Sequence, residues 1–316
     1  MRSNRILLLL ATMAAMAFTV AACGEDEETT SGSGGGDASA QESGGEELTG
    51  SIRIDGSSTV FPFAEAAGEL FNEEQPGVQI TVGQSGTGGG FEKFCAGETD
   101  IFNASRPIKE DEEVPVCEKA GVAFEEVQVA NDGIAVVTSK SVSVDCLTVD
   151  ELKAIWEPKS KNKDYTLFGP GTDSGTFDFF TDVINGEEGA SREDYEASED
   201  DNQLVTGVSG TDNGLAYFGF SYYEQNQDKL NLVALDGGDG CVKPSSATIQ
   251  DGSYKPLSRP LFMYPSDKAL QRPEVKAFVD FVIANQQAIA EAAQIVPMTE
   301  EQATESKSKV DALAGS

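Results

Sequence analysis

A strand, a polar loop and a helix follow one another in SIRIDGSSTVFPFAEAAGELFNEEQ, residues 51–75. Residues 51–54 alternate polar and apolar side chains, as a strand does. Apolar residues at helical spacing predict a helix over residues 64–75, and Pro76-Gly77 ends it. The connecting loop is Gly56-Ser57-Ser58-Thr59. This stretch therefore predicts one strand-loop-helix unit of an α/β protein.

The same order occurs twice more along the chain. The strand Val78 to Val82 leads into Gln84-Ser85-Gly86-Thr87-Gly88-Gly89-Gly90, and the strand Tyr165 to Phe168 leads to Asp173-Ser174-Gly175-Thr176. Alternating strands and helices predict mostly parallel sheets. The chain from Leu48 onward is long enough for two lobes, because domains commonly hold about 100–200 residues. Later in the chain, residues 273–293 carry the strongest helical pattern.

The three loops share a chemistry suited to an oxyanion. Each places hydroxyl groups and backbone N–H groups at the positive end of a helix dipole. For a single loop, ordinary helix capping is an equal explanation, but three such loops in one chain favour a binding site. Nucleotide sites fit less well, because no Gly-Lys-Ser/Thr follows any loop and Phe91 stands where a dinucleotide fingerprint requires its third glycine.

Two arginines are candidates for the positive charge of such a site. Arg106 lies in a short polar loop after the predicted strand Asp100-Ile101-Phe102, where its planar guanidinium could hold a tetrahedral anion with two hydrogen bonds. A surface salt bridge is the alternative for Arg106. Arg259, between Leu257 and Leu261, is assigned a structural role.

The N-terminus predicts export and a lipid anchor. Residues 1–22 combine two arginines, an apolar run and small residues before Cys23, which is typical of a signal peptide. Val20-Ala21-Ala22-Cys23-Gly24 resembles the bacterial lipobox, so we expect acylation of Cys23 and anchoring to the outer face of the cytoplasmic membrane. Residues 23–47 are rich in Gly, Ser and acidic residues and predict a flexible tether.

Net charge and cysteine content limit the macromolecules and metals that the chain can bind. The net charge of −32 excludes nucleic acid and anionic membrane surfaces as good partners, so contact with a membrane is expected through the lipid anchor alone. Four further cysteines in an exported chain favour disulfides, and we prefer Cys95 with Cys117 and Cys146 with Cys241 because each pair lies within one proposed lobe. A metal site is disfavoured, because the chain has no His and no Cys-x-x-Cys.

Enzyme chemistry finds little support in the sequence. The absence of His excludes serine hydrolysis through a histidine base. Asp173-Ser174-Gly175 matches an aspartic-protease signature, but that chemistry needs two such carboxylates and the chain has one copy. We therefore expect a monomeric binding protein without a cofactor.

Five motifs carry a family resemblance that runs in order from Leu48 to about Pro297. The chain resembles the PstS family of phosphate-binding lipoproteins, which implies a type II periplasmic-binding fold with two α/β lobes joined by two crossover strands. It also implies inorganic phosphate as ligand and the permease and ATPase of an ABC importer as partners. We place lobe I at residues 48–135 plus 256–316 and lobe II at 136–255. The motifs are Gly56–Pro62, Gly83–Phe91, Ala104–Ile108, Asp173–Phe177 and Val208–Gly214.

The resemblance also implies individual phosphate contacts. The best-known branch of the family has an aspartate where Arg106 stands, and an arginine where this chain has Pro170. A carboxylate that accepts a hydrogen bond from the ligand favours protonated phosphate over sulfate. Without this carboxylate, sulfate and molybdate remain alternative ligands. Asp173 is the candidate replacement, with helix capping as its alternative role, and Asp212 is a weaker one. The implied contacts are Ser58, Thr59, Ser85, Arg106, Ser174, Gly175 and Thr176.

Overall fold

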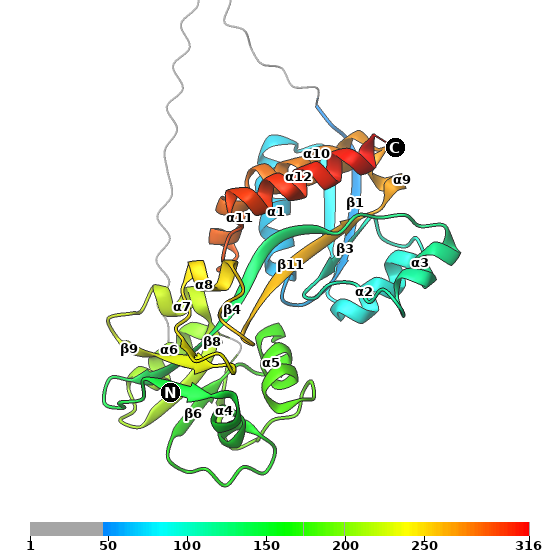
Figure 1. Ribbon diagram of the computed structural model, residues 1–316. Coiled ribbons are helices and arrows are strands. Elements are labelled where there is room, and N and C mark those ends of the chain that lie inside the picture. The colour runs from blue at the N-terminus through cyan, green and yellow to red at the C-terminus, as the bar shows by residue number, and fades with distance from the viewer. Residues whose placement is uncertain (1–46, 173, 199, 316) are drawn as a thin grey trace, which may run out of the picture. The chain divides into compact units, whose positions relative to one another are not determined.

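The computed structural model describes residues 47–172, 174–198 and 200–315 (Figure 1). The predicted signal peptide, Cys23 and Asp173 lie outside the described residues. The strands are β1 Gly50–Gly56, β2 Val78–Val82, β3 Ile101–Ala104, β4 Val127–Ser139, β5 Cys146–Thr148, β6 Thr166–Gly169, β7 Glu196–Ala197, β8 Gly214–Gly219, β9 Leu230–Asp236, β10 Cys241–Val242 and β11 Ser258–Pro265.

Helices alternate with these strands along most of the chain. They are α1 Phe61–Glu74, α2 Gly86–Cys95, α3 Val114–Ala120, α4 Val149–Trp156, α5 Gly175–Phe180, the π-helix η1 Thr181–Asn185, α6 Asp201–Ser209, α7 Phe220–Glu224, α8 Ser246–Gln250, α9 Asp267–Leu270, α10 Pro273–Ala284, α11 Gln286–Ala292 and α12 Glu300–Ala314.

Neighbouring strands are hydrogen-bonded in the order β2-β1-β3-β11-β4-β8-β6-β7. Outside this order, β9 pairs with β4, β5 and β10. β1 is parallel to β2 and β3, and β6 is parallel to β7 and β8. β11 runs antiparallel to β3 and β4. The predicted mixed α/β architecture with parallel units is therefore confirmed.

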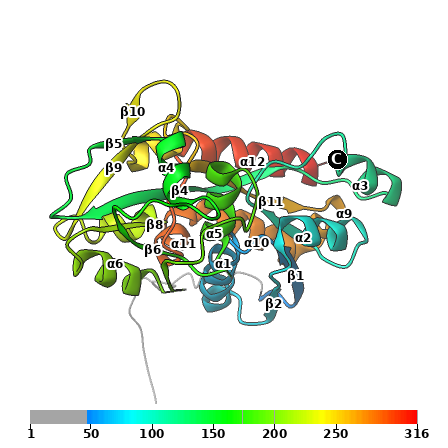
Figure 2. The same ribbon diagram turned by 90° about the horizontal axis from the view of Figure 1, so that it is seen from below.

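β4 belongs to both halves of this arrangement. Its first part, as far as Gly133, pairs with β11, and its second part, from Ile134, pairs with β8 and β9. Figure 1 shows β4 and β11 side by side, and in Figure 2 β4 extends from the strands around β1 to those around β8. These two strands are the crossover strands of a type II periplasmic-binding fold.

Two main hydrophobic cores lie on either side of the crossover. The first packs α1, α10 and α12 with β1, and its buried side chains include Phe63, Phe71 and Phe278. The second centres on Trp156, whose ring meets those of Phe180 and Tyr217 edge to face. Each core is closed by its own helices, so the strand ends between them are left to form a site.

One helix prediction is wrong. The apolar pattern over residues 273–293 predicts one helix, but the structure breaks it into α10 and α11 at Asn285. The backbone N–H and the side-chain amide of Asn285 both donate to the carbonyl of Phe281, at 2.9 and 3.0 Å. An asparagine side chain that bonds to the local backbone competes with continuation of the helix.

Two disulfides join the cysteines that the sequence favoured as pairs. Cys95 of α2 bonds to Cys117 of α3, and Cys146 of β5 bonds to Cys241 of β10. Cys95 and Cys117 are buried, whereas Cys241 is exposed. The second bridge spans 95 residues of chain, so it restricts a long loop of the unfolded protein. Among the described residues, no helix is long and apolar enough to cross a membrane.

We predict that the double variant Cys146→Ser/Cys241→Ser lowers the free energy of unfolding by about 2–4 kcal/mol. Because neither cysteine lines the cavities beside the three loops, ligand affinity should stay within about twofold of wild type. Urea denaturation and calorimetry measure the two quantities. A stability equal to that of the wild type would contradict the prediction.

Candidate functional site

The first loop turns sharply from β1 into α1. Gly56 has a φ of +145°, and a side chain there would place its Cβ 2.1 Å from the carbonyl oxygen of Asn103 in β3. Only glycine allows this close approach. The Oγ of Ser57 accepts the N–H of Thr59, at 3.2 Å, which fixes the turn. Ser58 and Thr59 are thereby held at the end of the sheet.

The second loop is shorter than the sequence suggests, because α2 begins inside the glycine run, at Gly86. Gly90 lies against β1, where a Cβ would come within 2.4 Å of the Cα of Gly56. Ser85 occupies the N-cap position but does not cap the helix with its side chain. Its hydroxyl bonds instead to the carboxylate of Asp55. α2 therefore packs tightly on β1, with Ser85 at its open end.

The third loop leads into α5. The hydroxyl of Ser174 accepts the N–H of Thr176, at 3.2 Å, so Ser174 is the N-cap. Asp173 lies outside the described residues, so both roles offered for it, acceptor and helix cap, stay predictions.

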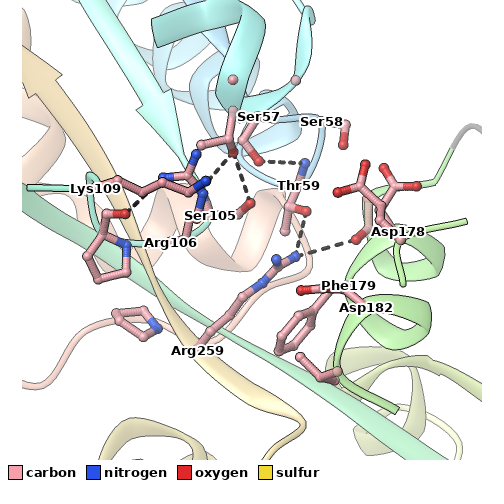
Figure 3. Close-up of a pocket in the computed structure, with 18 of the residues that line it drawn as sticks. Ser57, Ser58, Thr59, Ser105, Arg106, Lys109, Asp178, Phe179, Asp182 and Arg259 are labelled. Carbon is pink, nitrogen blue, oxygen red and sulfur yellow. Dashed lines mark hydrogen bonds between the residues drawn. The ribbon is translucent and has the colours of Figure 1, made fainter. Parts of the chain in front are cut away.

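These loops surround one cavity of about 690 Å³ (Figure 3). Ser58, Thr59, Ser85, Arg106 and Gly175 of the predicted set all line it. Thr176 and Ser174 line a neighbouring cavity of about 280 Å³, which shares Ser58, Thr59 and Gly175 with the first. The other polar residues that line the larger cavity are Ser57, Thr87, Ser105, Lys109, Asp178, Asp182, Glu188 and Arg259.

The first and third loops touch at Gly175. A Cβ at this position would lie 2.3 Å from the Oγ1 of Thr59 and 2.7 Å from the Oγ of Ser58. Any larger residue must push the two loops apart. The absence of a side chain at Gly175 therefore sets how closely the two sides of the cavity approach.

Arg259 of β11 supplies a cation inside the cavity. Its side chain is 14% exposed, and its Nε donates to Asp132 of β4, at 3.1 Å. Its Nη2 donates to the Oγ1 of Thr59, at 2.8 Å, and to the carbonyl of Gly175, at 3.4 Å. The guanidinium also lies 3.8 Å from the centre of the Phe179 ring. Figure 3 shows Arg259 pointing toward Thr59 and Asp178.

Arg106 lies at the cavity wall with its guanidinium engaged by Glu113. Two parallel hydrogen bonds, of 2.6 and 2.9 Å, join them. Burial raises the pKa of Glu113, but the hydrogen bonds and charges of Arg106 and Lys109 together outweigh this effect, and the pKa falls below its usual value. Both groups are therefore charged. The salt bridge named as the alternative for Arg106 is present, alongside its position at the cavity.

The opposite wall is acidic. Asp178 and Asp182 project from α5 and η1, and Glu188 follows. Asp212 is not among the described lining residues: its carbonyl accepts the hydroxyl of Ser139 at the far end of β4.

Sequence reasoning missed Arg259 as a cavity residue, because nothing near it in the chain indicates the site. Only the pairing of β11 with β4 brings it beside Asp132, 127 residues away in sequence. Thr87 and Ser105 were also missed, although both lie within motifs already singled out. Their hydroxyls are 3.2 Å apart and connect α2 with the loop after β3.

Comparison with known proteins gives a consistent result. Residues 29–286 match the model of the PBP superfamily domain. The phosphate-binding protein PstS of Staphylococcus saprophyticus is 38% identical over 281 residues, which cover 84% of this chain and 86% of that protein.

Two solved structures are similar to this one. A possible phosphate-binding protein from Planctomyces limnophilus is 41% identical, with a TM-score of 0.79 and coverage of 84% of this chain and 99% of that one. A putative phosphate ABC transporter substrate-binding protein from Clostridium perfringens, with bound phosphate, is 27% identical, with a TM-score of 0.56 and coverage of 79% and 100%.

We predict that Gly175→Ala weakens binding of phosphate, the ligand that the resemblance implies, by about tenfold or more. The added carbon overlaps the hydroxyls of Ser58 and Thr59, so the loops cannot meet around the ligand. Gly68→Ala in α1 is the control, since Gly68 does not line the cavity and the nearest atom to its added carbon lies 3.4 Å away, on Ile80. Calorimetry measures the affinities, and equal affinities for the two variants would contradict the role given to Gly175.

Proposed function

This chain belongs to the PBP superfamily and, within it, to the PstS family of phosphate-binding proteins, and from this premise we propose that it captures inorganic phosphate in the cavity between its two cores. It passes the anion to the membrane components of a phosphate ABC importer. The protein acts by binding and release, not as an enzyme.

The observation that carries the proposal is the composition of the cavity. Hydroxyl groups of the first two loops and of Ser105 line it, with Gly175 of the third loop and the guanidinium groups of Arg259 and Arg106 beside them. The hydroxyl groups of Ser174 and Thr176 line the adjoining cavity. Hydrogen-bond donors around a cation satisfy the several oxygens of a dehydrated tetrahedral anion. We propose the sequence-derived set, Ser58, Thr59, Ser85, Arg106, Ser174, Gly175 and Thr176, as phosphate contacts, with Arg259 added.

Arg259 is the better placed of the two arginines. Its Nη2 already donates to both loops that meet at the cavity, and its Nε pairs with Asp132. Both terminal nitrogens of Arg106 already donate to Glu113, so Arg106 must divide its N–H groups between Glu113 and the anion. We therefore assign most of the attraction for the anion to Arg259 and a supporting role to Arg106.

Capture and release require the two sides of the cavity to separate. β4 and β11 are the covalent connections that lie between the cores, so bending within them moves one core relative to the other. Phosphate bound to Thr59 on one side and to Gly175 on the other favours the closed form. The importer then receives the protein in that form.

We also propose that the chain is exported and held at the outer face of the cytoplasmic membrane by lipid on Cys23. The signal-peptide pattern of residues 1–22 and the lipobox-like residues before Cys23 support this. Residues 23–47 then tether the binding domain to the anchor.

We predict that the wild type binds phosphate more tightly than sulfate in calorimetry, and tighter sulfate binding would contradict the proposed function.

Arg259→Gln and Arg106→Ala should each weaken phosphate binding by at least about tenfold, with the larger loss at Arg259. Each change removes charge-assisted hydrogen bonds to the anion.

Two controls accompany these variants. Arg53→Ala removes an arginine that pairs with Asp100 outside the cavity, so its affinity should match the wild type. Arg259→Gln leaves Asp132 without its charged partner and lowers stability. The double variant Asp132→Asn/Arg259→Gln removes both charges and keeps the affinity measurable on folded protein.

We predict that Cys23→Ser moves the protein from the membrane fraction to the soluble fraction of expressing cells, because serine offers no thiol for acylation. Detergent phase partition and labelling with a fatty-acid analogue measure the change. If the Cys23→Ser variant stayed in the membrane fraction like the wild type, this result would contradict the proposed lipid anchor.

A further inference from the structure

The chain between α11 and α12 leaves one hydrophobic core and enters the other. Ala293 and Ile295 pack against the first core, whereas Val296, which is 3% exposed, belongs to the second. α12 then returns to the first core, where Val310 is buried. We call residues 293–299 the linking segment. It is a further place, besides β4 and β11, where the chain passes between the cores.

The linking segment is bonded to β4 next to a residue of the cavity. Asn131 of β4 pairs with Pro260 of β11 on one side and with Val296 on the other. The N–H of Asn131 donates to the carbonyl of Val296, at 2.8 Å, and the N–H of Val296 donates to the carbonyl of Asn131, at 3.0 Å. The next residue of β4, Asp132, holds Arg259. Because successive side chains of a strand point to opposite faces, the side chain of Asn131 lies behind β4, away from Arg259.

Side-chain amides behind β4 join the two cores. The amide of Asn131, a residue 2% exposed, donates to the carbonyl of Pro297, at 3.0 Å, and to the Oε1 of Gln302, at 3.2 Å. The amide of Gln302 donates to the carbonyl of Gln250, at 3.1 Å, and the amide of Gln250 donates to the carbonyl of Pro297, at 3.0 Å. Gln302 lies on α12 of the first core, and Gln250 lies on α8, whose Ile249 is buried in the second core (Figure 1).

A second amide contact between the cores involves Gln294. α11 ends with Gln294 in the left-handed region, at a φ of +58°, a position that glycine usually occupies. The N–H groups of Gln294 and Ile295 donate back to the carbonyls of Glu291 and Ala290, as they do at helix ends of this kind. The side-chain oxygen of Gln294 accepts the amide of Gln225, at the end of α7 in the second core. A side chain retained where glycine fits the backbone better indicates that this contact has a role.

These bonds belong to the form in which the first and third loops touch at Gly175. Opening the cavity turns one core relative to the other, so bonds between the cores must break or be exchanged for bonds to water. Contacts made in only one of two states favour that state. We propose that Gln302, Gln250 and Gln294 are positioning residues, which hold β4 and β11 at the bend that closes the cavity and thereby strengthen anion binding. This inference rests on the proposed function, because it takes phosphate as the anion.

Gln302→Glu tests the bond between α12 and α8. The Oε1 atom still accepts from Asn131 and from the N–H of Thr299, so the start of α12 keeps its cap. The carboxylate has no proton to donate to the carbonyl of Gln250. We expect phosphate affinity, measured by calorimetry on the full-length protein, to fall by about tenfold. Gln79→Glu is the matched control, because Gln79 is exposed on β2 and lines neither cavity, so the same change in charge should leave the affinity unchanged.

Gln294→Gly separates positioning from stability. Glycine suits the left-handed backbone, so the ligand-free variant should melt at the wild-type temperature or above it. Phosphate affinity should nevertheless fall by about threefold to tenfold, because the contact with Gln225 is lost. A residue with a structural role alone would not lower the affinity while the melting temperature is kept or raised.

Gln294 also lines the smaller cavity, so direct contact with the anion must be distinguished from positioning. Gln225→Ala, Gln294→Gly and the double variant should lose affinity by the same factor, because each removes the same bond. Losses that add would overturn the role given to Gln294.

The inference as a whole is overturned if Gln302→Glu binds phosphate as tightly as the wild type. If Gln302→Glu does not fold, the comparison of Gln225→Ala, Gln294→Gly and their double variant decides. A wild type that does not bind phosphate would overturn the proposed function, and this inference with it, whereas unchanged affinity in the variants would leave the proposed function standing.

Discussion

The guanidinium of Arg259 connects both crossover strands with two of the three loops that form the site. It rises from one crossover strand, bonds to Asp132 of the other, and reaches the loops before α1 and α5. A buried charge of this kind is tolerable only when its hydrogen bonds are satisfied, so the positions of both strands and both loops are linked to one side chain. The phenyl ring of Phe179 covers the face of the guanidinium and excludes water from it. The arrangement therefore holds a cation where an anion can reach it.

The surface charge of the protein opposes its proposed ligand. A net charge of −32 repels a small anion at a distance, but ions screen this field within about 8 Å at physiological ionic strength. Inside the cavity, hydroxyl groups and fixed dipoles act at hydrogen-bonding distance and in a medium of lower dielectric constant, where each interaction is stronger than in water. Affinity is then decided by the few groups that line the cavity, while the acidic surface keeps the protein soluble.

The sequence predicted the parts of the site that are local in the chain. Strand, loop and helix patterns located the loops that hold Ser58, Ser85 and Gly175, because loop chemistry and helix starts depend on neighbouring residues. The family resemblance then singled out these residues within the loops. The roles of Arg259 and Asp55 were not predicted, because their partners lie on other strands and helices and no local pattern reveals them. The break between α10 and α11 at Asn285 was not predicted for the opposite reason. The apolar periodicity continues through this residue, and a side-chain hydrogen bond marks the end of the helix. Sequence thus predicts elements well and the contacts between them poorly.

The acidic wall gives the cavity a counter-ion before any ligand arrives. Asp178 and Asp182, together with Asp132, oppose the lowering of the Arg259 pKa that burial causes. An entering anion must therefore compete with carboxylates already close to the guanidinium, and it must tolerate their charge as a neighbour. Each ligand oxygen that carries a proton lowers this repulsion, and each hydroxyl donor adds a bond that the carboxylates of the wall do not satisfy. The carboxylates of the wall therefore disfavour a fully ionised anion, whereas the hydroxyl donors of the cavity bind any tetrahedral oxyanion.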